Sequence, residues 1–189
     1  EMFYEILKQK VIGHIPQETR MEGGDFFVLD GRWSLLGVGL RTKIESAAYL
    51  MENDLIGTKF FGVVRDECDL DQDRMHLDTI FNVLSEREVV LLDFDTVPKK
   101  VKDGKELDLR RRIAIFRRRK SKEVSSSGKT YYGKYELQKE MEFEEFLKEQ
   151  ELVVHKVPHQ YQMEYMINFL NVGEKTIISC HERLGKFLQ

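Results

Sequence analysis

The chain has 189 residues, a formal net charge of −3, 41% apolar residues and 33% charged residues. This is the composition of a soluble globular domain, and the small net charge gives no global attraction to nucleic acid or anionic membranes. No apolar run is long enough to span a membrane, and the first ten residues lack the features of a signal peptide. We therefore expect a cytoplasmic protein with no nucleic-acid or membrane partner. Cys68 and Cys180 do not make a disulfide framework.

Apolar runs bounded by turn residues predict strands along the whole chain. They cover residues 11–15, 59–65, 76–85, 88–94, 152–158 and 175–180. Residues 26–39 predict a hairpin, because two apolar runs flank Asp30 and Gly31, a pair that favours the type I′ turn. A further strand is expected within 109–122, between two arginine triplets.

Helical patterns alternate with these strands. They cover residues 1–10, 42–54, 136–150, 161–173 and the chain from 181 onward. Thr42 and Glu45 suggest a capping box with Thr42 as the N-cap, and Gly173 would close the fourth helix. A polar loop or insertion is expected at about 117–135. Since the order hairpin, helix, strand recurs roughly twice, the sequence predicts an α/β fold that differs from a plain Rossmann sheet.

Five polar residues stand beside or within the apolar runs. Glu22 and Asp25 flank two glycines before the hairpin, and Arg41 follows it. His76 and Asp78 open a predicted strand, where a spacing of two would place both side chains on one face. A histidine beside a carboxylate can move protons and hold a cation, and burying such groups is costly unless they pair or bind a ligand.

A structural interpretation of the same residues stays open. Glu22 could form an ion pair with Arg41, and Asp25 could brace the turn at the glycines. His76 could be a core histidine whose nitrogens are satisfied. The residue pattern by itself favours this structural interpretation.

Longer motifs carry a resemblance to a known family. EGGDFFVLDGRWSLLGVGLRT, followed by MHLDTIFNVLS and more loosely by MINFLNVGEKTIIS, resembles arginine deiminase of the guanidine-modifying superfamily. The resemblance implies an α/β-propeller (the pentein fold) of five ββαβ modules around a central site. Residues 1–189 would be part of a single catalytic propeller domain, incomplete in this chain. Exposed module edges lead us to expect a homo-oligomer.

The resemblance also implies an activity, with no metal or cofactor. L-arginine is hydrolysed to L-citrulline and ammonia through a thiouronium intermediate on a cysteine. His76 would be the general acid/base and Glu22 its partner. Asp78 would hold the guanidinium and Arg41 the substrate carboxylate. Asp25 would lie near the α-amino group or only brace the turn.

The nucleophilic cysteine of the family has no counterpart in the motifs found. Cys180 ends a predicted strand, and Cys68 lies in an acidic run that disfavours a thiolate. The nucleophile and a second carboxylate for the guanidinium are therefore expected outside this chain. We expect these 189 residues alone to bind arginine weakly and not to turn it over.

Several alternatives remain at this stage. A dimethylarginine hydrolase or agmatine deiminase relative is the close alternative, and Arg41 argues against agmatine because agmatine has no carboxylate. A non-catalytic, propeller-derived binding protein is another. The basic run 110–122 with Tyr131 and Tyr132 could bind RNA, although a charged strand edge explains it more simply. The crowded acids around His76 lack zinc or calcium spacing, so no metal is expected.

Overall fold

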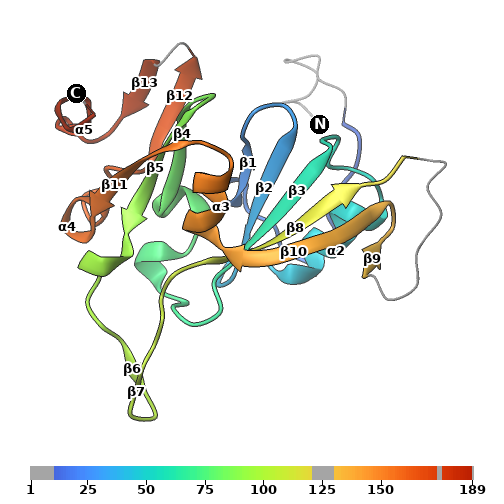
Figure 1. Cartoon of the computed structure of the whole chain (residues 1–189), viewed down its shortest axis with the longest axis horizontal. Helices are drawn as coiled ribbons and strands as arrows, with labels where there is room; N and C mark the ends of the chain where they lie inside the picture. The colour runs from blue at the N-terminus through green and yellow to red at the C-terminus, as the bar shows by residue number, and fades with distance from the viewer. Residues whose placement is uncertain (1–10, 121–129, 174–175, 189) are drawn as a thin grey trace.

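The computed structural model describes residues 11–120, 130–173 and 176–188. Within them the chain forms two sheets and two short two-stranded ribbons (Figure 1). The six-stranded sheet has, in spatial order, β1 (Phe26–Val28), β2 (Trp33–Val38), β3 (Phe60–Arg65), β8 (Arg112–Arg118), β10 (Tyr135–Glu142) and β9 (Tyr131–Tyr132). The second sheet has the order β11 (Val153–Pro158), β5 (Glu88–Asp93) and β4 (Phe81–Ser85).

The remaining elements are short. The ribbons are β12 (Phe169–Gly173) with β13 (Thr176–Ser179), and β6 (Val101–Lys102) with β7 (Lys105–Glu106). The helices are α2 (Ile44–Glu52), α3 (Phe143–Glu149), α4 (His159–Gln162) and α5 (Leu184–Phe187). Single 3₁₀ turns are η1 (Gly23–Asp25), η2 (Gln72–Arg74), η3 (Leu77–Thr79) and η4 (Phe94–Thr96). None of the described helices is long and apolar enough to cross a membrane.

Two ββαβ units form the framework of the two sheets. In the first, β1 and β2 are antiparallel, α2 follows, and β3 pairs with β2 in parallel. In the second, β4 and β5 are antiparallel, and β11 follows α3 and pairs with β5 in parallel. Strands β6 to β10 lie between β5 and α3 in sequence, and β8 and β10 extend the sheet of the first unit. The predicted α/β class and the recurring order of elements are confirmed.

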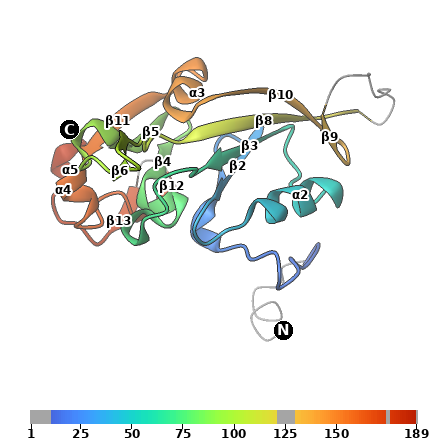
Figure 2. The same ribbon diagram turned by 90° about the horizontal axis from the view of Figure 1, so that it is seen from below.

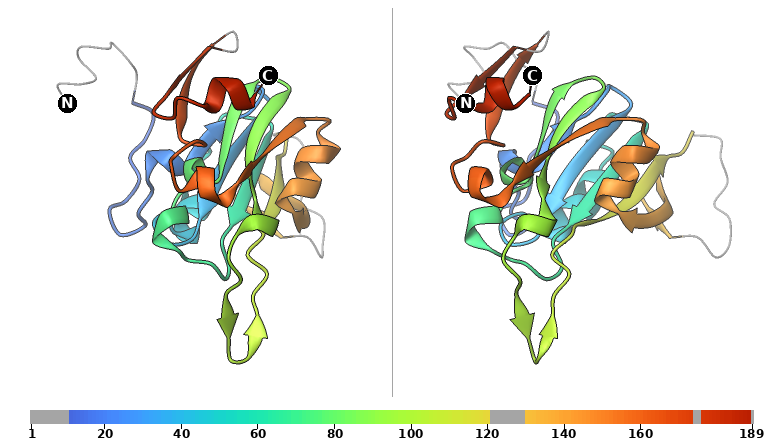
Figure 3. Two further views of the ribbon diagram at one scale, coloured as in Figure 1. Left: turned by 90° about the vertical axis from the view of Figure 1, so that its left-hand side faces the viewer. Right: turned by 60° about the vertical axis from the view of Figure 1, so that its left-hand side comes forward.

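Strand β2 is buried along its whole length because both faces of its sheet are covered. Leu35 belongs to a core that packs the two sheets and α3 together. The next residue, Leu36, belongs to a second core with residues of α2. Figure 2 shows α2 and α3 on opposite faces of the six-stranded sheet. Neighbouring residues of a strand face opposite sides, so a strand covered on both faces reads as a continuous apolar run. The β6–β7 ribbon, in contrast, projects from the body and is exposed (Figure 3).

Most predicted elements are present. The structure contains the hairpin at 26–39, the C-terminal helix as α5, and the strands predicted at 59–65, 88–94, 109–122, 152–158 and 175–180. The strand at 11–15 was wrongly predicted, because no neighbouring strand in the described chain pairs with it. The helix at 1–10 lies outside the described residues. Of the loop at about 117–135, the described part places residues 117–118 in β8 and 131–132 in β9.

The turn of the first hairpin is not type I′. That type requires positive φ at both central residues, whereas Gly31 has φ +71° and Asp30 is not in the positive range. The Asp30 carboxylate instead accepts hydrogen bonds from the backbone N–H groups of Arg32 and Trp33. These side-chain hydrogen bonds stabilise the reversal of the chain between β1 and β2, and the connection is longer than the two residues of a type I′ turn.

The helix predicted at 136–150 is half strand and half helix. Residues 135–142 form β10, which pairs with β8, and α3 begins only at Phe143. A bulge between Leu137 and Lys139 changes the face on which apolar residues point. Leu137 packs in the core under α2, whereas Met141 packs in the core between the sheets. The glutamates and lysines favour a helix, and ladder pairing with β8 overrides that preference.

The helix predicted at 161–173 is likewise wrong. Only a short helix, α4, is present, and Tyr165 adopts φ +62°, which ends helical geometry. The side-chain amide of Asn82 then donates to the carbonyls of Ile167 and Phe169, at 2.9 and 2.8 Å. The side-chain amide of Asn171 in turn donates hydrogen bonds to the carbonyls of Val83 and Leu84 in β4. These distant partners hold the segment in the extended form of β12.

Candidate active site

The five predicted site residues gather where η1 packs against η3. Glu22 and Asp25 stand at the start and end of η1, His76 precedes η3, and Asp78 lies within it. Arg41 comes from the turn after β2. The strand predicted at 76–85 begins only at Phe81, so His76 and Asp78 do not share a strand face as expected. A 3₁₀ turn brings them to the site instead.

Glu22 joins a histidine and an arginine. One carboxylate oxygen, Oε2, lies 2.6 Å from His76 Nε2, and the other, Oε1, accepts a hydrogen bond of 2.9 Å from Arg41 Nε. The hydrogen bond with His76, together with Arg41, lowers the pKa of Glu22 against an opposing effect of burial. A carboxylate that stays ionised beside an imidazole orients the ring and stabilises its protonated form.

Arg41 is only partly held by this contact. Its side chain is 44% exposed, and among the described residues its terminal Nη atoms make no hydrogen bond. Two parallel N–H groups of a guanidinium fit a carboxylate. Arg41 can therefore stay paired with Glu22 through Nε and bind an anionic group through its outer nitrogens.

Asp25 is buried and fully used in protein contacts. It is 3% exposed, Oδ1 accepts a 2.8 Å hydrogen bond from the backbone N–H of Leu77, and Oδ2 accepts one of 2.5 Å from the Thr42 hydroxyl. Burial raises the pKa of Asp25, and these two hydrogen bonds oppose the rise. Such contacts belong to a group that fixes η1 against η3.

Thr42 is a site residue that sequence reasoning assigned wrongly. It is fully buried, and it does not cap α2, whose N-cap residue is Lys43 with no side-chain hydrogen bond. Its hydroxyl oxygen accepts from the backbone N–H of Glu22 at 3.0 Å while its proton goes to Asp25. The one hydroxyl thus links both acids of the Glu-Gly-Gly-Asp motif. In the sequence, the Arg-Thr pair that follows the hairpin was the feature that could have indicated this position of Thr42 beside the two acids.

Asp78 differs from Asp25 in having an unused oxygen. Its Oδ1 is buried and has no hydrogen-bond partner among the described residues. Burial raises the pKa of Asp78, while the nearby His76 charge and a hydrogen bond from Asn168 act to lower it. A buried carboxylate oxygen without a donor costs free energy, and native proteins keep few of them. Asp78 Oδ1 can therefore accept a hydrogen bond from a donor that the described chain does not supply.

Two glycines make the close packing possible. A Cβ on Gly24 would lie 2.6 Å from Asp78 Oδ2, and one on Gly37 would lie 2.6 Å from Asp25 Oδ1. Only glycine tolerates such an approach. A cavity of about 20 Å³ remains between Gly37, Asp25 and His76, which is room for a water molecule and not for an amino acid. The packed contact between Gly37, Asp25 and His76 therefore leaves no space for a larger ligand.

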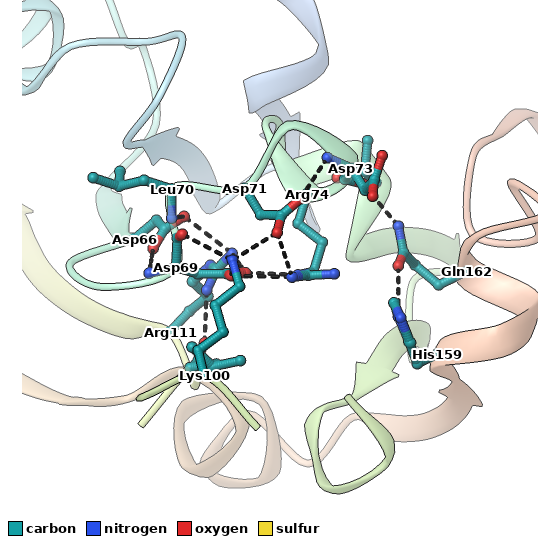
Figure 4. Close-up of polar contacts among 12 residues, drawn as sticks. Asp66, Asp69, Leu70, Asp71, Asp73, Arg74, Lys100, Arg111, His159 and Gln162 are labelled. Atoms are coloured by element: carbon teal, nitrogen blue, oxygen red, sulfur yellow. Dashed lines mark hydrogen bonds and ion pairs between the residues drawn. The ribbon is translucent and has the colours of Figure 1, made fainter. Parts of the chain in front are cut away.

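A buried ionic cluster underlies the segment that carries His76 (Figure 4). The fully buried Asp69 carboxylate bonds Arg74 through two nitrogens, at 2.6 and 3.0 Å, and lies 3.1 Å from Arg111 and 2.6 Å from Lys100. Burial acts to raise the pKa of Asp69, but these three cations hold it far below its usual range. Arg74 is two residues from His76, so the cluster fixes the approach to η3.

Two of the acids before His76 in the chain, Asp69 and Asp71, are thus engaged with cations. Lys100 also bonds Asp71 at 2.6 Å, and among the described residues no group of three His, Cys, Asp or Glu side chains could hold a metal ion. Cys68 and Cys180 are both exposed free thiols. Cys180 Sγ lies 3.7 Å from the backbone oxygen of Asn168, the residue whose side chain bonds Asp78.

Comparison with known proteins assigns the family. The family model described as arginine deiminase matches residues 5–185, and the chain belongs to that family. A search of curated proteins gives no match. Among solved structures, the apo form of ArgZ, an arginine dihydrolase from the ornithine–ammonia cycle in cyanobacteria, is similar with a TM-score of 0.57 and 18% identity. The similarity covers 99% of this chain and 22% of that one, so the chain spans less than a quarter of the neighbour's length.

Proposed function

We propose that this chain is part of a hydrolase that converts L-arginine to L-citrulline and ammonia. The observation that carries the proposal is the buried, unpartnered Oδ1 of Asp78 beside the His76–Glu22 pair. A guanidinium presents a planar fork of N–H donors, and a buried carboxylate is the matching acceptor. Family membership supports the same substrate class.

The residues would then divide the work along the substrate. Asp78 holds the guanidinium at one end, and the outer nitrogens of Arg41 bind the α-carboxylate at the other. Asp25 keeps η1 and η3 together and is a bracing group in this proposal. The two ββαβ units would be modules of a propeller ring whose further modules are not among these residues.

The chemistry proposed is covalent catalysis. A cysteine thiolate attacks the guanidinium carbon, the C–N bond breaks, and His76 gives a proton to the departing ammonia. His76 then removes a proton from water, which attacks the thiouronium carbon, and the C–S bond breaks to release citrulline and the thiolate. Glu22 stabilises the protonated imidazole before the first proton transfer and again after the second, and it orients the neutral ring between them. In this proposal the nucleophile is neither Cys68 nor Cys180.

The first test separates binding from turnover. L-arginine binding is measured by calorimetry with the intact chain and with Asp78→Asn, and citrulline release is measured in parallel. Asp103→Asn is the matched control, because it removes a carboxylate from the exposed β6–β7 turn. Binding that is lost in Asp78→Asn and kept in Asp103→Asn supports the proposal. Equal affinity in all three proteins contradicts it.

Two further measurements separate the alternatives. Agmatine lacks the carboxylate of arginine, so it should bind more weakly than arginine if Arg41 binds that carboxylate. The two affinities should then become equal in Arg41→Ala, and this result would support arginine as the substrate. A preference for dimethylarginine would favour the relative that hydrolyses methylated arginines. Arginine binding with no citrulline from any assembly of the protein would favour a non-catalytic binding protein. Citrulline release that stops in Cys180→Ser would make Cys180 the nucleophile and contradict its exclusion.

A further inference from the structure

A basic cavity lies at the end of the six-stranded sheet that is distant from the candidate active site. It has a volume of about 690 Å³, within the range of small-molecule sites. Its lining includes five cationic side chains: Lys59, Arg118, Arg119, Lys120 and Lys134. Strand β3 (Phe60–Arg65) separates Lys59, which lines this cavity, from Asp66, which pairs with Arg111 of the ionic cluster, and an extended segment of this length spans roughly 20 Å.

Backbone pairing holds these cations at fixed positions. The N–H of Arg118 donates to the carbonyl of Lys59 at 2.8 Å, and the N–H of Arg119 donates to the carbonyl of Lys134 at 2.9 Å. The residue before β3, the end of β8 with the residue after it, and the turn between β9 and β10 are thus joined by backbone hydrogen bonds, and Figure 1 shows these strands side by side in the sheet. Since the backbone under the side chains is already ordered, a ligand here would order little beyond the side-chain ends.

The charge of this cavity is poorly balanced. Asp54 accepts hydrogen bonds from Arg118 Nε at 2.6 Å and from Lys134 at 2.7 Å, and mainly the Arg118 contact lowers its pKa to about 2. Among the described residues, the Asp54 carboxylate pairs with this lining, and it faces four cations besides Arg119: Lys59, Arg118, Lys120 and Lys134. Lys59 lies over the Phe60 ring, 5.0 Å from its centroid, a contact that brings no negative charge. Like charges gathered in one concavity raise the local concentration of anions.

We propose that the basic cavity binds a small polyphosphate, either an inorganic chain or the phosphate tail of a nucleotide. A phosphate chain brings several negative charges into a small volume, and its oxygens suit both the guanidinium fork and the ammonium point charge. A singly charged anion would leave most of the cationic charge uncompensated. The site is separate from the proposed arginine site and does not depend on it.

Single-stranded RNA fits the same surface less well. Binding of RNA bases needs aromatic faces on which they can stack. The nearby tyrosines are engaged: the Arg119 guanidinium lies 4.6 Å from the Tyr131 ring centroid, and Tyr132 packs edge-on against Phe116. The cations gather around one open concavity of about 690 Å³, which matches a short chain of phosphates.

The test is calorimetric titration of the full chain with tripolyphosphate, ATP and adenosine at low salt. The variant Lys59→Glu/Lys120→Glu changes two exposed cations and spares the pairs with Asp54. Lys102→Glu/Lys105→Glu is the matched control, since it makes the same charge change on the exposed β6–β7 ribbon. We expect one equivalent of tripolyphosphate to bind, with affinity at least about tenfold lower in the first variant and nearly unchanged in the second.

The outcomes differ clearly. Equal affinities for ATP and tripolyphosphate would support the phosphate chain as the ligand. A higher affinity for ATP than for tripolyphosphate would support a nucleotide. No binding of either, or an equal loss in both double variants, would overturn the proposal. An RNA oligonucleotide that binds far tighter than tripolyphosphate, with a steep salt dependence, would also overturn it in favour of a nucleic-acid surface.

Discussion

Gly24 and Asp78 approach so closely that a single added carbon at Gly24 would lie 2.6 Å from the Asp78 carboxylate. The contact joins η1 to η3, and Asp78, whose Oδ1 has no hydrogen-bond partner among the described residues, also interacts electrostatically with His76, which is hydrogen-bonded to Glu22. The two glycines of the motif are not equivalent, because nothing lies within 4 Å of a Cβ at Gly23.

This difference gives a matched pair of variants. Gly24→Ala should destabilise the fold by about 1–3 kcal/mol, the usual cost of overpacking, because the Asp78 carboxylate has to move. Gly23→Ala should have little effect. Urea unfolding measures both. Arginine affinity should fall in Gly24→Ala alone, and equal stability of the two variants would contradict the close contact.

Asp78→Asn should stabilise the protein while it removes arginine binding. Burial raises the pKa of Asp78, so the folded state holds its proton more tightly than the unfolded chain does. The contribution of this group to stability is therefore best at low pH, and it is lost as pH rises from the usual value of 3.8 through the higher folded value. At neutral pH, removal of the charge should add about 1 kcal/mol, a low figure because Asp78 is only half-buried.

Thermal unfolding across pH 3–7 checks this expectation. The gain in melting temperature from Asp78→Asn should grow with pH and vanish near the acid end of the range. Asp25→Asn provides the contrast: its pKa is raised too, but both of its oxygens accept hydrogen bonds, and an amide cannot replace both. Asp25→Asn should therefore destabilise the protein. Stabilisation by both variants would mean that the hydrogen bonds of Asp25 contribute little.

The sequence predicts the first ββαβ unit well, because its signals are local. The hairpin around Asp30, the helix after Arg41 and the strand at 59–65 each follow from short-range apolar patterns and turn residues. The predicted site residues also come together, since the longer motifs identify them jointly. Local pattern is enough where each element has the partner next to it in sequence.

The second unit is predicted less well, because distant contacts decide its structure. The apolar residues after Tyr135 fit a helix until a bulge in β10 is known, and β10 exists because β8 offers a free edge. Asn82 holds the segment at 167–169 extended from more than eighty residues away. The role of Thr42 is hidden for the same reason, since a threonine before a helix reads as a cap until Asp25 is placed beside it.

Thr42→Val should expose the importance of that hydroxyl. Valine keeps the shape but leaves Asp25 Oδ2 and the Glu22 N–H without their partner, so we expect a loss of about 1–3 kcal/mol. Thr42→Ser retains the hydroxyl and should restore most of the stability. Chemical denaturation of the three proteins measures this, and equal stability of the valine and serine variants would show that the hydroxyl does not link the two acids.

The buried ionic cluster should make stability fall steeply in acid. The cations around Asp69 lower its pKa, so its contribution to stability is fully present above the usual value of 3.8 and is lost as pH falls toward the lower folded value. Asp69→Asn should cost about 3–5 kcal/mol at neutral pH, since it leaves Arg74 and Arg111 buried without their shared carboxylate. Denaturant unfolding from pH 2 to 7 follows the difference between variant and parent, which should shrink below pH 3.8. Asp71→Asn is the control, because Asp71 is more exposed and should lose less. A difference for Asp69→Asn that stays constant down to pH 2 would contradict an ionised, buried Asp69 in the native state.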